Sequence, residues 1–182
     1  MNATDLNHNA FSEHQLKHYE KRAPDFSGRF VRWFLEHIFR LEQSDADDAC
    51  VDAKHDKGVD AIYVDDVTET VFIIQSKTNT KDNSEFGDTE LKEFFGTLQQ
   101  FDSKQKIDEV IAETKNDRLK QTIVRTDLAG KVESGYDVRG VFISNARANG
   151  DAKAIITKLP KIDLFDADAI ANDYVDLDID GG

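Results

Sequence analysis

Apolar side chains recur at helical spacing in two long stretches of the chain. The first begins after Pro24, where Asp25 is a favoured N-cap, and the second begins at Asp88 or Thr89, with Glu90 in its first turn. The two stripes are Phe26, Phe30, Phe34, Ile38 and Leu41, and Leu91, Phe94, Phe95, Leu98 and Phe101, the latter continuing through Ile107, Val110 and Ile111. The pattern predicts two core helices, a shorter amphipathic stretch at 11–21 and a polar loop at 42–48.

Short runs rich in β-branched and aromatic residues lie between and after these helices. The strongest are 59–64 and 71–77, with others at 50–53, 138–144 and 162–165 and a further helix at 152–158. The short connection 65–69 predicts that the two strongest runs form an antiparallel hairpin. The order helix, three strands, helix, strand predicts one α/β domain over 1–172, with a mixed central sheet flanked by helices, a core at about 25–165 and a flexible acidic tail at 173–182.

The hairpin brings polar residues together between apolar neighbours. If its centre lies between Val67 and Thr68, opposed residue numbers sum to 135, which places Asp60 opposite Gln75. Strand side chains alternate between faces, so Gln75 and Lys77 share one face, and cross-strand pairing puts Asp60 on that face as well. The sequence therefore predicts a polar cluster inside a core hairpin.

These residues have the chemistry of a metal site. The Asp60 carboxylate, the Gln75 amide oxygen and the Ser76 main-chain carbonyl are hard oxygen donors that suit Mg²⁺ or Mn²⁺. Lys77 beside them would stabilise negative charge that develops on a phosphate. The alternative is an ordinary ion pair between Asp60 and Lys77, with Gln75 at the sheet edge, because buried charges are tolerated when they are paired.

Composition restricts the classes of function. The formal net charge of -13 argues against a uniformly basic nucleic-acid-binding surface, although residues 162–182 contribute seven acidic and no basic groups, and a metal ion would cancel charge at a carboxylate centre. A single cysteine excludes an internal disulfide, and no apolar run is long enough for a membrane span. With no secretion signal at the N-terminus, the chain is expected to be cytoplasmic and without a membrane partner.

The hairpin also resembles a known family. It contains the segments Asp56-Lys57-Gly58-Val59-Asp60-Ala61-Ile62-Tyr63 and Gln75-Ser76-Lys77. They resemble the GxD…QxK signature of Mrr-like PD-(D/E)xK endonucleases, and more closely the N-terminal domain of the abortive-infection phage-resistance (AIPR) family. The resemblance implies a restriction-endonuclease-like αβββαβ core. It also implies that Asp60 is the metal-binding acid, Gln75 a variant of the usual second acid, and Lys77 the catalytic lysine.

In such proteins the first core helix often contributes a glutamate to the metal, and Glu36 is the candidate here. Arg32 and Arg40 flank Glu36 at i-4 and i+4, so a surface ion-pair ladder is the alternative. The resemblance implies a Mg²⁺-dependent endonuclease that acts on nucleic acid, in particular DNA, in defence against phage. A homodimer is expected where both strands are cut, since two cuts need two centres.

Two other functions remain open from the sequence. One is a catalytically weak or inactive nuclease-fold module that binds nucleic acid or a partner protein, which Gln75 and the acidic charge favour. The other is an acidic mimic of nucleic acid, which the apolar surroundings of the central motif disfavour.

Overall fold

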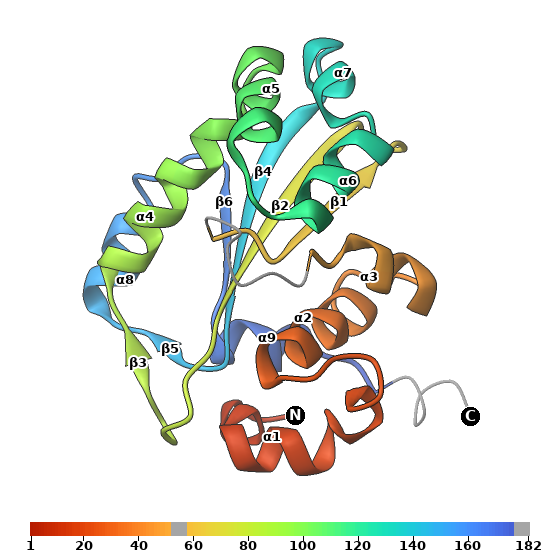
Figure 1. Cartoon of the computed structure of the whole chain (residues 1–182). Coiled ribbons are helices and arrows are strands. Elements are labelled where there is room, and N and C mark those ends of the chain that lie inside the picture. Colours follow the sequence, from red (N-terminus) through yellow and green to blue (C-terminus); the bar gives the residue numbers. More distant parts are fainter. Residues whose placement is uncertain (52–57, 177–182) are drawn as a thin grey trace.

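A four-stranded sheet forms the centre of the molecule, in the order β1-β2-β4-β6 (Figure 1). Its strands are β1 (Ala61–Asp65), β2 (Thr70–Lys77), β4 (Asp137–Ser144) and β6 (Ile162–Phe165). β1 and β2 are antiparallel, whereas β2, β4 and β6 run parallel. This computed structural model describes residues 1–51 and 58–176. The predicted α/β class, with a mixed central sheet between helices, is confirmed.

The N-terminal part of the chain and the last helix cover one face of the sheet (Figure 1). These elements are η1 (Ala3–Leu6), α1 (His8–His14), η2 (Lys17–Tyr19), α2 (Phe26–His37), α3 (Gln43–Ala49) and α9 (Ala167–Asp173). The Asp25 carboxylate caps α2 as predicted, accepting a hydrogen bond from the Gly28 N–H at 2.8 Å. Trp33 and Phe34 of α2 are fully buried in the same apolar cluster as Ile74 of β2.

The other face is covered by the middle of the chain. Its elements are α4 (Asp88–Leu98), η3 (Gln99–Phe101), α5 (Lys104–Glu113), α6 (Asp117–Arg125), α7 (Leu128–Glu133) and α8 (Gly150–Ile156), beside a small parallel pair of β3 (Glu85–Phe86) and β5 (Arg147–Ala148). α4 packs closely on β4 at Gly140, which has no side chain. A Cβ at this position would lie 2.9 Å from the Phe94 ring. No helix in the described part of the chain has both the length and the apolar character that crossing a membrane requires.

The structure corrects several predictions for the helices. The stretch 42–48 is not a loop but α3, whose buried side consists only of Ala46 and Ala49, too small a stripe for periodicity to reveal. The second long helical region is divided in two, because a new helix, α5, begins after its own N-cap, Ser103. The N-cap of α4 is Gly87 and not Asp88 or Thr89. Helices α6, α7 and α9 lie where the sequence analysis assigned no element.

Two predictions at the ends of elements also change. The strand expected at 50–53 is reduced, within the described residues, to one isolated bridge from Cys50 to Ala61, and residues 52 and 53 lie outside those residues. The tail expected to be flexible from residue 173 is ordered at its start, since the Tyr174 ring stacks on Trp33 with centroids 5.6 Å apart. Residues 177–182 lie outside the described part.

Candidate functional site at the end of the β1–β2 hairpin

The predicted hairpin register is confirmed along β1 and broken at the residue before it. Partners from Ala61↔Ile74 to the end of β1 keep the predicted sum of 135. The Asp60 N–H donates to the Ile74 carbonyl at 2.8 Å, although Ile74 is already the partner of Ala61. Two consecutive residues that face one residue of the next strand form a β-bulge. Simple alternation predicts that Asp60 lies directly opposite Gln75. The bulge prevents this pairing, and the Asp60 carboxylate instead reaches Ser76 near the end of β2.

The Asp60 carboxylate binds the main chain of β2 beside this bulge. Its Oδ2 atom accepts a hydrogen bond from the Ser76 N–H at 2.7 Å, a short distance that suits an ionised acceptor. The carboxylate thus replaces the main-chain acceptor that β1 no longer offers to Ser76. Because the N–H and C=O of one strand residue point to the same edge, the Ser76 carbonyl lies on the Asp60 side of β2. The Asp60 carboxylate therefore contacts the Ser76 main chain through the Ser76 N–H.

The Gln75 side chain is held against the chain segment that leads to Asp60. Gly58 has a φ of +86°, and a Cβ there would lie 2.9 Å from the Gln75 Nε2 atom, so both the conformation and the contact require glycine. The same position lies 3.6 Å from the Thr97 hydroxyl of α4. Within the described residues, the Gln75 Oε1 atom is buried and accepts no hydrogen bond. A buried oxygen without a donor is costly, which suits a position that binds a cation.

Lys77 lies two residues further along the same face. Ile73, Gln75 and Lys77 are spaced two residues apart along β2, so all three lie on the face where Ile73 packs under α4. The Lys77 side chain is exposed, and it forms no ion pair with any residue in 1–51 or 58–176. The alternative prediction of an Asp60–Lys77 ion pair is therefore wrong for the described residues.

A buried asparagine fixes the loop that follows Lys77. The Asn145 side chain accepts a hydrogen bond from the Asn79 N–H at 2.8 Å and donates to the carbonyls of Asn79 at 2.9 Å and Leu6 at 3.2 Å. Asn145 follows β4 directly, so it ties the ends of two neighbouring strands to the N-terminal segment. Sequence reasoning missed Asn145 because its partners are far away in the chain.

The structure places Glu36 elsewhere. It lies on α2, on the sheet face opposite α4, and lines a polar cavity of about 460 Å³ with Tyr19 and Arg22. Its carboxylate pairs with the Arg22 guanidinium at 3.0 Å. Burial, and next the charge of Glu36, raises the pKa of Tyr19, which therefore stays a neutral phenol beside that carboxylate.

Glu36 is therefore not brought together with Asp60 and Gln75. The alternative prediction, that Glu36 forms an ion pair, is confirmed, but the predicted partners are wrong. Glu36 pairs with Arg22 and not with the arginines at i-4 and i+4. Arg32, at i-4, pairs instead with Asp47 of α3 at 2.9 Å.

The donor set that remains contains one carboxylate. No group of three or more histidine, cysteine, aspartate or glutamate residues within 1–51 and 58–176 is arranged to hold a metal ion. Asp60, Gln75 and the Ser76 carbonyl would instead combine one charged with two neutral oxygens. Asp56 and Lys57, at the start of the motif that resembles the family, lie outside the described residues.

Comparison with known proteins adds no relative to this picture. No protein-family model, curated protein or solved structure matches the chain.

Proposed function

We propose that the protein is a metal-dependent nuclease of the PD-(D/E)xK kind, similar to the nuclease-type domain of AIPR proteins, which hydrolyses phosphodiester bonds in DNA. One observation carries the proposal: at a β-bulge, the Asp60 carboxylate meets the Ser76 main chain beside the buried, unbonded Gln75 oxygen. Lys77 extends from the same strand face. A single structural ion pair would not explain this combination.

In the proposed centre, Asp60, Gln75 and the Ser76 carbonyl would hold Mg²⁺ or Mn²⁺. The bound ion supplies Lewis-acid chemistry, polarising a phosphate oxygen and making water more acidic. The bulge and the Ser76 N–H fix the Asp60 carboxylate in place, while Gly58 restrains the Gln75 amide. The exposed ammonium of Lys77 would contact the scissile phosphate and stabilise the charge that develops on it. The anchored loop after Lys77 limits how far that strand end moves.

The proposal predicts cleavage of supercoiled plasmid in Mg²⁺ or Mn²⁺ that stops when the metal is chelated. Lys77→Ala should slow it roughly 100-fold or more, because one preorganised cation at the transition state is lost. The matched control is Lys153→Ala, an exposed lysine of α8, which should leave the rate within about twofold. Single-stranded DNA and RNA, assayed in parallel, identify the substrate. Equal rates for the two variants would contradict the assignment of Lys77.

A second candidate is a nuclease-fold module that binds nucleic acid or a partner protein without cutting. The amide of Gln75 in place of a second carboxylate favours it, because one charged donor holds a divalent cation weakly. Binding of this kind would survive chelation of the metal.

Gln75→Glu distinguishes the two candidates. In metal-free buffer the new carboxylate beside Asp60 should lower the free energy of unfolding by about 2 kcal/mol, since a partly buried like charge is added. Mg²⁺ should then raise the Tm of Gln75→Glu more than that of the parent chain. Gln75→Met, of similar size but without a donor oxygen, should lose any response to Mg²⁺. If Gln75→Glu cuts plasmid and the parent does not, the parent is the binding module; a Tm that metal leaves unchanged in all three would contradict a metal site here.

A further inference from the structure

Within residues 1–51 and 58–176, the outer edge of β1 is open along most of its length. β1 is an end strand of the sheet, and within the described residues only Cys50 bridges its outer edge, at Ala61. The neighbouring Val51 N–H donates to the Asp60 carbonyl at 3.0 Å. Main-chain groups alternate between the two edges of a strand, so those of Ile62 and Val64 point away from β2. An open edge of this kind is a template for a further strand.

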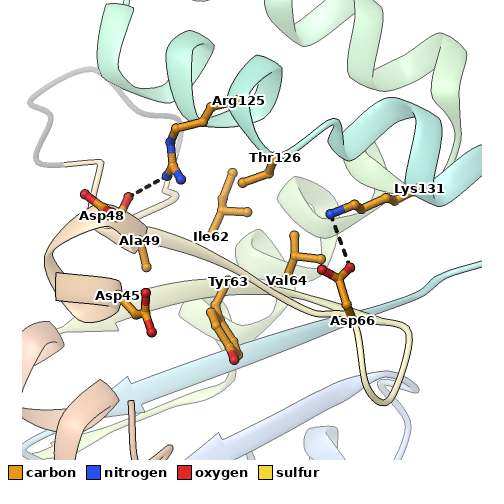
Figure 2. Close-up of a pocket in the computed structure, with 10 residues that line it drawn as sticks. All are labelled: Asp45, Asp48, Ala49, Ile62, Tyr63, Val64, Asp66, Arg125, Thr126 and Lys131. Carbon is orange, nitrogen blue, oxygen red and sulfur yellow. Dashed lines mark hydrogen bonds and ion pairs between the residues drawn. The ribbon is translucent and has the colours of Figure 1, made fainter. Parts of the chain in front are cut away.

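A groove of about 280 Å³ runs along this edge (Figure 2). One wall is α3, with Asp45 and Asp48, and the other is formed by Arg125 and Thr126 at the end of α6 and Lys131 of α7. β1 forms the floor. The groove is thus open where a strand would be added and walled on both sides.

The two faces of this added position differ in chemistry. Figure 2 shows Ile62 and Val64 directed toward α6 and α7, and Tyr63 directed to the other side, close to Asp45. Ile62 and Val64 belong to the apolar cluster under α4 to α8, whereas Tyr63 packs on the α2 and α3 side. Side chains of a bound strand alternate in the same way, so one set would meet Val64 and the α6–α7 wall, and the other would meet Tyr63 and the aspartates.

The charges of the groove leave the α3 wall negative. Arg125 donates to the Asp48 main-chain carbonyl at 3.0 Å, and Lys131 pairs with the Asp66 carboxylate at 3.2 Å. Both cations are therefore engaged. The carboxylates of Asp45 and Asp48 have no ion-pair partner in 1–51 or 58–176. Lysine or arginine side chains of a bound partner would form ion pairs with these two carboxylates.

Two exposed apolar side chains are sequence neighbours of residues that line the groove. Val67 follows Asp66 in the turn after β1, and Val124 precedes Arg125 on α6, with 93% and 63% of their surfaces exposed. They are the two most exposed large apolar side chains in the described part of the chain.

We propose that this groove binds an extended, basic segment of a partner protein, which adds to the sheet as a strand beside β1. The segment would alternate apolar residues, which pack beside Val64, with lysine or arginine, which face Asp45 and Asp48. The open edge offers main-chain bonds to roughly three residues, at about 3.3 Å of strand per residue. The site lies on the outer edge of β1 and does not depend on nuclease activity.

The test uses a fluorescein-labelled hexapeptide of alternating valine and lysine and measures anisotropy with the full chain at low salt. We expect a Kd on the order of 10–100 µM, as for a short peptide with few contacts. The double variant Asp45→Asn/Asp48→Asn should bind about tenfold more weakly. The matched control Asp82→Asn/Asp151→Asn removes the same charge from exposed sites away from the groove and should change binding less than about twofold.

Further probes separate strand addition from simple charge attraction. N-methylation of alternate peptide nitrogens, in both registers, should weaken binding at least about tenfold in one register, because ladder bonds are lost. Bound peptide should also slow hydrogen exchange of the Val64 N–H. Failure of the parent chain to bind the lysine peptide, equal binding of a glutamate peptide, or an unaffected aspartate double variant would overturn the proposal. So would sedimentation showing that a second copy of this chain occupies the edge, with Val64 protected in the dimer.

Discussion

Asp60→Asn should reduce metal-dependent cleavage on the order of 1000-fold while leaving the protein folded. The substitution removes the negative charge that would hold the metal, yet it keeps an oxygen that can accept the hydrogen bond from the Ser76 N–H. The free energy of unfolding should therefore fall by only about 1 kcal/mol, as a charge-assisted hydrogen bond becomes a neutral one. Plasmid cleavage and urea unfolding measure the two effects on the same preparation.

Two further variants separate the charge from the hydrogen bond. Asp60→Ala removes both, so its stability should fall by about 2 kcal/mol more than that of Asp60→Asn, because the Ser76 N–H loses its acceptor. Asp65→Asn lies at the other end of β1, where Asp65 accepts from the Val67 N–H at 2.9 Å, and should leave cleavage unchanged. Full activity in Asp60→Asn would show that Asp60 is not part of the active centre and that it serves only as the acceptor for the Ser76 N–H.

The hairpin was predictable because two local signals agree. β-branched and aromatic residues mark both strands, and the short connection between them determines the register, which the structure keeps from Ala61 to Asp65. The bulge was not predictable, because it inserts one residue without changing the pattern of residue types. Gly58 was the available signal: a glycine close before a strand often marks a bulge or a tight contact. The face shared by Gln75 and Lys77 follows from alternation alone and holds.

The prediction for Glu36 shows that a single sequence does not identify ion pairs between different elements of the fold. Helical spacing identified candidate partners only at i-4 and i+4, but the arginine that pairs with Glu36 is Arg22, before the helix begins. Arg32 is likewise engaged outside its helix, by Asp47 of α3. Contacts between elements depend on how helices pack, and the pattern along one helix does not contain that information. The same limit hid α3, whose acidic residues suggested a loop although Asp47 bonds two arginines.

This Asp47 network should be the most sensitive ionic feature of the fold. Asp47 pairs with Arg22 at 2.7 Å and with Arg32 at 2.9 Å, and the Arg32 side chain is only 5% exposed. Asp47→Ala should lower the free energy of unfolding by about 2 kcal/mol, less than for a fully buried pair because Asp47 itself is partly exposed. The neighbouring Asp48→Ala, whose carboxylate has no ion-pair partner in the described chain, should change it by less than about 0.5 kcal/mol.

The effect of Asp47 should also depend on pH. Burial alone would raise the pKa of Asp47, but hydrogen bonds and charge attraction from Arg22 and Arg32 outweigh it and hold the pKa below its usual value. A carboxyl with a lowered pKa in the folded state contributes stability above its unfolded pKa of about 4, and loses that contribution as pH falls through the lower folded value. Urea unfolding at pH 7 should therefore separate the parent chain from Asp47→Ala. The difference should shrink as pH falls below about 4, because protonated Asp47 no longer holds the two arginines. A difference that stays constant across that range would show that Asp47 stabilises the fold by packing and not by its charge.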